Sequence, residues 1–191
     1  MTAIVLATRN AHKVREFERL LPGVDIAPLP ESAPTPEETG STYAENALIK
    51  ARSAAQATGE PSFADDSGIE AEALDWRPGV YTARFAGPNA TDGENLAKLH
   101  REAPAGSRAR YVCVIAFAAP DGREELFEGT CEGTLAQEPA GGGGFGYDPL
   151  FVPVEFPDRT MAALTDDEKD SISHRGKAAR AMAAWLEGRG A

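Results

Sequence analysis

The stretch Arg110-Tyr-Val-Cys-Val-Ile-Ala-Phe-Ala-Ala119 decides the fold class, because it carries the strongest strand signal in the chain. Pro120-Asp121-Gly122 follows it, and these residue types favour a tight turn. Residues 124–135 then predict a second strand, so the two strands form an antiparallel hairpin. A sheet that contains such a hairpin is not purely parallel.

On either side of the hairpin, predicted strands alternate with predicted helices. Residues 3–7 are continuously apolar, as in a strand buried on both faces, and apolar residues at helical spacing follow until Pro22-Gly23. Two capping boxes, Thr42–Glu45 and Thr91–Glu94, open further helices. The remaining expectations are strands at 62–64, 69–73 and 150–152, irregular segments at 28–40 and 78–89, and a mostly helical end at 165–187. This pattern predicts an α/β fold with a mixed sheet flanked by helices.

The composition is that of one ordinary globular domain, which we predict to span residues 1–191. Hydrophobic residues make up 42% and charged residues 26% of the chain. The net charge of −11 argues against nucleic acid as a partner, because binding to its phosphate backbone relies on clustered Lys and Arg. A protein this acidic would bind phosphate at a local site, with a metal ion to help.

The two cysteines, Cys113 and Cys131, lie in no CxxC pair and near no histidine at ligand spacing. We interpret them as buried free thiols, which fits a reducing compartment. Residues 1–7 lack the basic region of a signal peptide, and the longest apolar run, 112–119, is too short to span a bilayer. We therefore expect a cytoplasmic protein with no membrane partner.

The sequence Phe63-Ala64-Asp65-Asp66-Ser67-Gly68 places two adjacent carboxylates after a short apolar run. Neighbouring carboxylates stay ionised at neutral pH only when a cation, hydrogen-bond donors or water compensate their charge. Mg²⁺ suits this role, since it takes carboxylate oxygens and keeps waters and substrate phosphates as its other ligands. An acidic surface turn is the alternative, and it is the better interpretation of this hexapeptide alone.

Two further segments could join the acidic pair. Thr8-Arg9-Asn10-Ala11-His12-Lys13 lies where a predicted strand meets a predicted helix, and a helix N-terminus binds anions. Asn10 as an ordinary cap beside a solvated Lys13 is the simpler reading of that segment by itself. Glu37-Glu38 precedes the first capping box, either as a partner of the helix dipole or as a source of one more metal ligand.

The glycine run 141–144 leads directly into Phe145-Gly146-Tyr147-Asp148, which is unlike a flexible linker. Glycines let a backbone approach a ligand closely, and an aromatic ring offers a face on which a base can stack. Lys169 and Ser173-His174-Arg175-Gly176 form a basic group near a predicted helix start, where a ligand with acceptor atoms would explain them. A solvated charged face, interleaved with neighbouring acidic residues, is the competing interpretation.

Together these segments resemble the inosine triphosphate pyrophosphatase family, the non-canonical purine nucleoside triphosphate pyrophosphatases. The matching segments run in the family's order from residue 6 to residue 178. They are LATRNAHKVREFERLL, EETGSTYAENALIKA, FADDSGIEAEAL with PGVYTARFAG, GGGGFGYDPLF and ALTDDEKDSISHRGKA. The chain departs from the family pattern at Arg9, where a small residue is frequent, and at Ala163, where Glu is frequent.

The resemblance implies an elongated two-lobed architecture with a central cleft, usually as a homodimer, and Mg²⁺-dependent hydrolysis of ITP, dITP and XTP to monophosphate and pyrophosphate. It implies Asp66 as general base, and Glu38 and Asp66 as Mg²⁺ ligands with Asp65 as a further candidate. The implied substrate-binding residues are Thr8, Arg9, Asn10, Ala11, His12 and Lys13 at the triphosphate, Ser67, and Phe145, Gly146, Tyr147, Asp148, Lys169, His174 and Arg175 around the base.

Two other functions fit the same residues. A related pyrophosphatase for modified pyrimidine nucleotides would use the same carboxylates with a different base pocket. A nucleotide-binding sensor would keep the pocket without turnover, although the intact Asp65-Asp66 pair argues against it, since a sensor needs no general base.

Overall fold

The structure is a computed structural model that describes residues 3–188, so residues 1–2 and 189–191 of the predicted domain lie outside the described residues. The strands are β1 (Ile4–Leu6), β2 (Ile26–Pro28), β3 (Ser62–Ala71), β4 (Arg77–Pro78), β5 (Arg108–Ala118), β6 (Glu124–Leu135) and β7 (Phe151–Pro153). The helices are α1 (Ala11–Leu20), α2 (Tyr43–Thr58), α3 (Asp92–Glu102), α4 (Asp166–Ile172) and α5 (His174–Gly188), with 3₁₀ turns at Glu72–Leu74, Gly79–Arg84 and Met161–Ala163.

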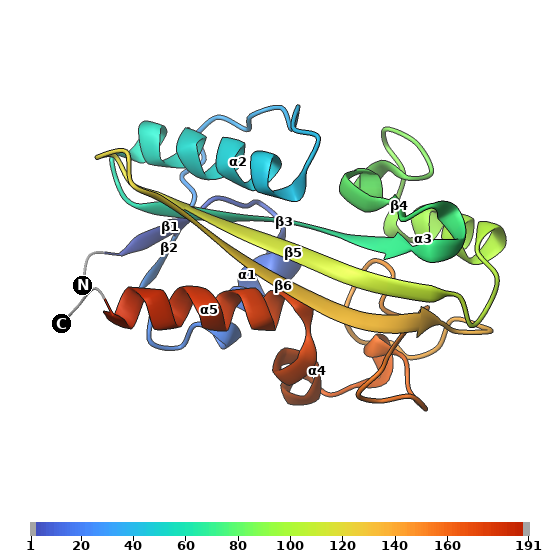
Figure 1. The fold of residues 1–191 in the computed structure, drawn as a ribbon. Helices are drawn as coiled ribbons and strands as arrows, with labels where there is room; N and C mark the ends of the chain where they lie inside the picture. Colours follow the sequence, from blue (N-terminus) through green and yellow to red (C-terminus); the bar gives the residue numbers. More distant parts are fainter. Residues whose placement is uncertain (1–2, 189–191) are drawn as a thin grey trace. The chain divides into compact units, whose positions relative to one another are not determined.

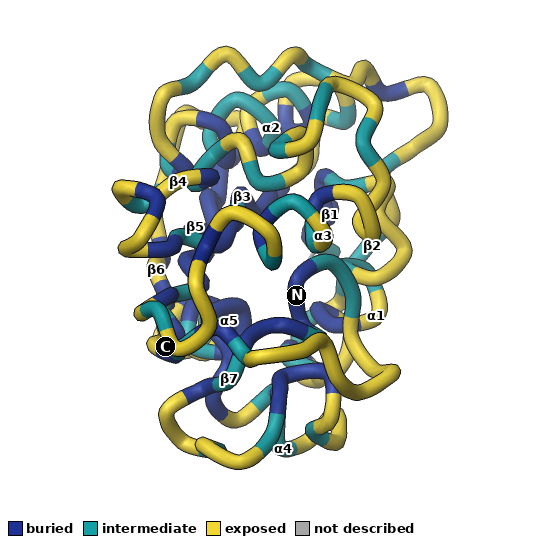
Figure 2. The backbone as a smooth tube through the Cα atoms, turned by 90° about the vertical axis from the view of Figure 1, so that its right-hand side faces the viewer, coloured by how far each residue is buried: buried dark blue, intermediate teal, exposed yellow. Residues whose placement is uncertain are grey.

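The strands form one seven-stranded mixed sheet in the order β2-β1-β3-β5-β6-β7, with β4 paired to β3. β1 runs parallel to both β2 and β3, whereas β7 runs antiparallel to β6. A tight turn joins β5 to β6, closed by the bond from Gly122 N–H to the Ala119 carbonyl. β3 and β5 are buried along most of their length (Figure 2). The predicted mixed α/β fold is confirmed.

The chain divides into two compact units, each with its own core. Of the described residues, the first unit holds 3–66, 113–129 and 175–188, and the second holds 67–112 and 130–174. The two lobes and cleft implied by the family resemblance stay a prediction. None of the described helices has the length and apolar character needed to cross a bilayer.

In the first unit, α2 covers one face of the sheet, and α1 and α5 cover the other (Figure 1). Alanines supply the contact under α2, namely Ala47, Ala51, Ala54 and Ala55 against Ala64, Ala116 and Ala118. Small side chains let the helix lie close to the strands. Larger residues fill the opposite face, where Phe17 of α1 and Met182 of α5 pack on Phe63.

In the second unit, the core gathers around the outer halves of β3, β5 and β6. Ile69, Leu99 and Phe151 are fully buried in it. Tyr147 and Leu150, which directly follow the glycine run, also belong to this core. The segment after the glycines is therefore packed into the second unit and is not a linker.

Several local predictions are confirmed, and three need correction. Both predicted capping boxes are formed, and a third one, Thr165–Glu168, opens α4. The predicted acidic turn is wrong, because β3 runs without interruption through Asp65 and Asp66. The strand predicted at 69–73 ends at Ala71, and the sheet has an edge strand that was not predicted, β2, ending on Pro28, a residue that edge strands tolerate. The mostly helical segment predicted at 165–187 is confirmed as α4 and α5, with a break at Ser173.

Candidate functional site

The adjacent carboxylates Asp65 and Asp66 point to opposite faces of β3, because successive side chains alternate along a strand. Phe63 and Ala64 already show this alternation, since Phe63 packs toward α1 and α5 while Ala64 packs toward α2. The two aspartates continue it, and each meets a different set of cations. The two aspartates therefore have different ion-pair partners.

Asp65 lies on the face of α1 and α5, where two cations hold it. Lys13 Nζ of α1 lies 2.9 Å from Oδ1, and Arg175 Nη2 of α5 lies 3.1 Å from Oδ2. Arg175 also pairs with the buried carboxylate of Glu16 in α1. Burial alone would raise the pKa of Asp65, but the charges of Lys13 and Arg175, with that of Lys50, hold it well below its usual range. Asp65 is thus a buried carboxylate whose charged form is stabilised by the cations around it.

Asp66 lies on the face of α2, in a different electrostatic setting. Lys50 Nζ of α2 lies 2.9 Å from its Oδ1, and Asn46 Nδ2 donates weakly to Oδ2 at 3.4 Å. Burial raises the pKa of Asp66 above its ordinary value, with the charge of Lys50 opposing the effect. A raised pKa makes this carboxylate a stronger base than Asp65. Of the two, Asp66 is the one suited to accept a proton.

Glu38 converges on the same place as Asp66. Lys50 Nζ lies 2.7 Å from Glu38 Oε1 and 2.9 Å from Asp66 Oδ1, so one ammonium bridges the two carboxylates. The arrangement is held by Asn46, whose side chain accepts from Gly40 N–H at 2.8 Å just after Glu38. A pair of oxygen ligands that already converges on a cation fits Mg²⁺, which commonly takes one or two carboxylates plus substrate phosphates. Within residues 3–188, no cluster of three or more metal-ligating side chains is formed.

The segment 8–13 builds the start of α1. Asn10 is the N-cap, and its side-chain oxygen accepts from the N–H groups of His12 and Lys13 at 2.9 and 3.4 Å. Thr8 in turn accepts from Asn10 N–H, while Ala11 and His12 are exposed in the first turn. The sequence reading of Asn10 as a helix cap is confirmed. The reading of Lys13 as a solvated charge is wrong, because its side chain is only 16% exposed and pairs with Asp65.

Arg9, which the family resemblance places at the triphosphate, has its guanidinium bonded to backbone carbonyls. Nη2 donates to the carbonyl of Ala33 at 2.8 Å and to that of Glu31 at 3.2 Å. These bonds tie the start of α1 to the irregular segment that carries Glu38 farther along. Backbone carbonyls therefore satisfy the extra charge, and Arg9 acts as a brace between two segments of the first unit.

In the second unit, the carboxylate of Asp148 gathers most of the residues predicted around the base. Its Oδ2 accepts from Lys169 Nζ at 2.8 Å and from Phe145 N–H at 3.0 Å, and its Oδ1 accepts from the Tyr111 hydroxyl at 3.1 Å. Lys169 Nζ also lies 5.3 Å from the centre of the Phe145 ring. Asp148 and Lys169 are both buried, so their charges are paired out of water.

The neighbours of Asp148 show why glycines precede it. Gly144 has φ +68°, and a Cβ at this position would collide with the Asp148 carboxylate. Gly146 N–H donates to Asp92 at 3.2 Å, and the Tyr147 hydroxyl donates to the Thr82 carbonyl at 2.7 Å. The backbone thus wraps closely around one buried carboxylate.

The remaining predicted residues separate between the units. His174 belongs to the second unit, where its ring stacks on Tyr111 with centres 4.6 Å apart. Ser67, directly after Asp66, also belongs to the second unit. Arg175 belongs to the first, and its guanidinium pairs with Asp65 and Glu16, a partnership that sequence reasoning did not predict.

Sequence reasoning also missed Asn46 and Lys50. They lie four residues apart on α2 and so share one face of the helix, next to the alanine stripe of the core. Two polar residues at this spacing, beside small residues, are the signal that could have found them. Glu16 and Tyr111 gave no comparable signal, because each lies in a segment that reads as ordinary helix or buried strand.

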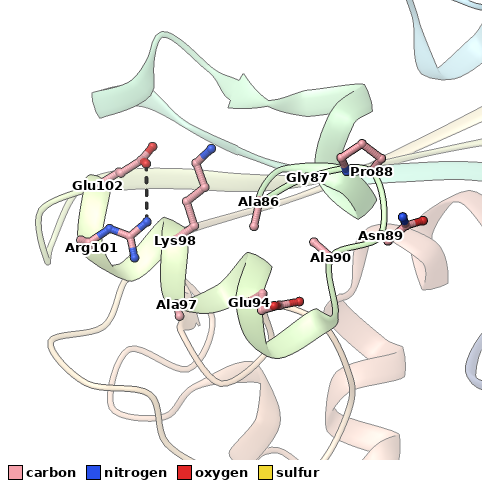
Figure 3. Close-up of a pocket in the computed structure, with 10 residues that line it drawn as sticks. All are labelled: Ala86, Gly87, Pro88, Asn89, Ala90, Glu94, Ala97, Lys98, Arg101 and Glu102. Carbon is pink, nitrogen blue, oxygen red and sulfur yellow. Dashed lines mark ion pairs between the residues drawn. The ribbon is translucent and has the colours of Figure 1, made fainter.

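An open pocket in the second unit is lined by other residues. It has a volume of about 640 Å³ and lies between the loop 86–90 and α3 (Figure 3). Its basic side chains are already engaged, because Lys98 donates to the Phe85 carbonyl at 2.8 Å and Arg101 pairs with Glu102. The described residues that line it include none of the predicted site residues.

Comparisons with known proteins all indicate the same family. The sequence profile of the Ham1 family matches residues 4–185. A dITP/XTP pyrophosphatase from Cutibacterium acnes is 49% identical over 204 residues, covering 99% of this chain and 100% of the relative. Another protein of that name, from Symbiobacterium thermophilum, is 51% identical, covering 96% of this chain and 93% of the relative.

Solved structures agree with the sequence matches. The Staphylococcus aureus Ham1 protein superposes with a TM-score of 0.86 at 40% identity, covering 98% of this chain and 100% of that one. A HAM1 protein from Coxiella burnetii gives the same TM-score at 43% identity, again covering 98% and 100%. The resemblance seen in the sequence is confirmed by both kinds of match, and the chain belongs to the Ham1 family.

Proposed function

We propose that this protein hydrolyses the non-canonical purine nucleoside triphosphates ITP, dITP and XTP to monophosphate and pyrophosphate, with Mg²⁺ as cofactor. The observation that carries the proposal is the convergence of Glu38 and Asp66 on one cation, at 2.7 and 2.9 Å from the Lys50 ammonium. The names of the relatives from C. acnes and S. thermophilum support the substrate class. Removal of these nucleotides from the precursor pool is the corresponding cellular role.

In the proposed reaction, a water molecule attacks the α-phosphorus and pyrophosphate leaves. Asp66 accepts the proton of that water, a role for which its raised pKa suits it and which is typically worth ~10²–10⁴-fold in rate. Asp65 takes no proton, because Lys13 and Arg175 hold it ionised. Its part is to position Lys13 at the start of α1.

Glu38 and Asp66 would hold Mg²⁺, which supplies charge neutralisation and orientation of phosphate oxygens when bound. Lys50 adds fixed positive charge beside these carboxylates, and Lys13 adds it beside Asp65 on the other face of β3. The positive end of the α1 helix dipole would also attract a triphosphate. Positioning and charge compensation of this kind account for most catalysis of phosphoryl transfer.

The group around Asp148 would select the base. A 6-oxo purine presents an acceptor at position 6, whereas adenine presents an amino donor there. The Lys169 ammonium has only donors, so an adenine at the same place would present a donor to a group that cannot accept from it. Rejection of that kind can reach ~10⁴-fold. Phe145 would stack on any base and add affinity without this selectivity.

A substrate panel with product identification tests the proposal. The purified protein is incubated with Mg²⁺ and ITP, XTP, ATP or a modified pyrimidine triphosphate, and pyrophosphate and orthophosphate are measured separately. We expect pyrophosphate from ITP and XTP, little product from ATP, and loss of activity with EDTA. Asp66→Asn is the inactive control, and Asp121→Asn, an exposed aspartate 55% accessible in its side chain, is the matched active one.

Each rival has a distinct result in this panel. Preference for the modified pyrimidine would identify the related pyrophosphatase, and nucleotide binding without any product would identify the sensor. Orthophosphate as the first product would place the attack at the γ-phosphorus and overturn the proposal. A homodimer, implied by the family resemblance, is the assembly that we propose, and light scattering measures it directly.

A further inference from the structure

Tyr111 of β5 is buried beneath the predicted base-binding group, and it contacts that group in two ways. Its hydroxyl donates to Asp148 Oδ1 at 3.1 Å. Its ring stacks on the His174 ring, with centres 4.6 Å apart and planes inclined by only 9°. The Phe151 ring lies on Tyr111 as well, at 4.7 Å, and fixes it in the core of the second unit. One core residue therefore supports two residues predicted at the base.

The contact with Asp148 has consequences beyond one hydrogen bond. Asp148 accepts from three donors that come from separate parts of the chain, namely Tyr111, Lys169 and the Phe145 N–H. The orientation of its carboxylate thus fixes both the ammonium of Lys169 and the backbone that carries Phe145. Without the Tyr111 bond to Oδ1, the carboxylate is held only through Oδ2, so the positions of Lys169 and Phe145 are fixed less firmly.

We propose that Tyr111 is a positioning residue for recognition of the purine base, acting through Asp148, Lys169 and His174. This inference rests on the proposed function, since it concerns the same nucleotide. Tyr111 remains a neutral donor throughout the working pH range, because burial, followed by the charge of Asp148, raises its pKa. Asp148, Lys169 and His174 all belong to the second unit and are residues predicted at the base, so we expect Tyr111 to act at the base end of the nucleotide.

A positioning role and a purely structural role predict different results for Tyr111→Phe. This variant removes the hydroxyl and keeps the ring, so the stack on His174 and the packing on Phe151 are retained. If Tyr111 only fills the core, the change lowers thermal stability and affects every ligand alike or none. If it positions the base-binding group, the change affects ligands that carry a base and spares those that have none.

The experiment measures binding of IMP, AMP and inorganic pyrophosphate to the wild type and Tyr111→Phe by calorimetric titration in the presence of Mg²⁺. We expect the Kd for IMP to rise about 10-fold, the size of a lost hydrogen bond to a charged group, while the Kd for pyrophosphate changes less than about twofold. The ratio of IMP to AMP affinity should narrow. With ITP as substrate, KM should rise by a similar factor, with kcat nearly unchanged.

A double-mutant cycle tests whether the effect passes through Asp148 and Lys169. Tyr111→Phe should add less than about twofold to the Kd for IMP when Lys169 is already Met, since the group that it positions is gone. Tyr81→Phe, at a tyrosine that is 56% exposed, is the matched control and should bind both ligands as the wild type does. Thermal melting of every variant accompanies the titrations.

The outcomes separate the claims. Equal weakening of IMP and pyrophosphate, or an unchanged Kd for IMP, would overturn the positioning role of Tyr111, as would full additivity with Lys169→Met. A wild type that binds IMP but releases no pyrophosphate from ITP would instead overturn the proposed function and leave the binding comparison intact.

Discussion

Asp65→Asn should destabilise the fold, whereas Asp66→Asn should abolish turnover and leave stability nearly intact. The two substitutions are chemically identical and lie at adjacent positions, so they form a matched pair. Their expected difference follows from the two faces of β3. Asp65 is only 1% exposed in its side chain and neutralises Lys13 and Arg175, whereas Asp66 is a carboxylate whose charged form the fold disfavours.

The magnitude for Asp65→Asn follows from its burial. Removal of one partner from a buried ion pair typically costs about 3–5 kcal/mol, because the remaining charge, here that of Lys13, loses its compensation, while Arg175 keeps Glu16. For a chain of this length, each kcal/mol shifts Tm by roughly 2–4 °C, so Tm should fall by roughly 6–20 °C. Asp66→Asn removes a charge that burial disfavours, and Lys50 keeps Glu38 as a partner. Its Tm should therefore stay within about 2 °C of the wild type, while kcat falls at least ~10²-fold.

Thermal melting and urea unfolding measure the stability of each variant, and pyrophosphate release from ITP measures its catalytic rate. Asp121→Asn controls for the loss of a surface carboxylate. If Asp65→Asn melts like the wild type, the carboxylate is not the partner that holds Lys13 and Arg175. If Asp66→Asn keeps near-normal turnover, Asp66 is not the general base.

Three further predictions follow from other contacts. Lys50→Met should increase the affinity of the free protein for Mn²⁺, because the ammonium no longer competes for Glu38 and Asp66. Electron paramagnetic resonance without nucleotide measures this affinity, and unchanged Mn²⁺ binding would contradict a metal site at these two carboxylates. Arg9→Ala should speed hydrogen exchange at residues 30–35, since the bonds to the carbonyls of that segment are lost, and Arg123→Ala should not. Hydrogen bonds from Arg159 and Thr165 lower the pKa of Glu168 to about 2, so its stabilising effect is complete above the ordinary pKa of about 4.5 and is lost as pH falls toward 2. Urea midpoints should therefore fall less steeply over that range in Glu168→Gln, and parallel profiles would exclude the effect.

The parts of the fold that local signals specify could be predicted from the sequence. The β5–β6 hairpin has its turn residues next to its strands, and Thr42 and Thr91 carry their capping glutamates three positions later. Each of these signals determines the conformation of residues only a few positions away in the sequence. The break at Ser173 was missed for the converse reason, since the helical pattern continues on both sides of it.

The partners of Asp65 and Asp66 could not be predicted from the neighbouring sequence. A strand that carries two consecutive aspartates is stable only because cations from three distant positions, Lys13, Lys50 and Arg175, compensate them. No sequence feature near Asp65 indicates those partners, so Asp65 and Asp66 were interpreted as part of a turn. The family resemblance named both aspartates as candidates, and the structure shows that each contacts different cations.

Tyr111 is a stronger case of the same limit. Within an apolar strand its residue type indicates only core packing, and its contacts are with residues 37 and 63 positions later in the chain. Sequence alone identified Asp148, Lys169 and His174 as candidates. Only the folded arrangement reveals the residue that holds two of them in place.

Hydrolysis of ITP in ¹⁸O-labelled water tests the central claim most directly. Attack on the α-phosphorus places the labelled oxygen in IMP and none in pyrophosphate. We predict that mass spectrometry finds one ¹⁸O in the IMP formed by the wild type and negligible product with Asp66→Asn. Label in pyrophosphate, or labelled orthophosphate as the first product, would show attack at a different phosphorus and contradict the account.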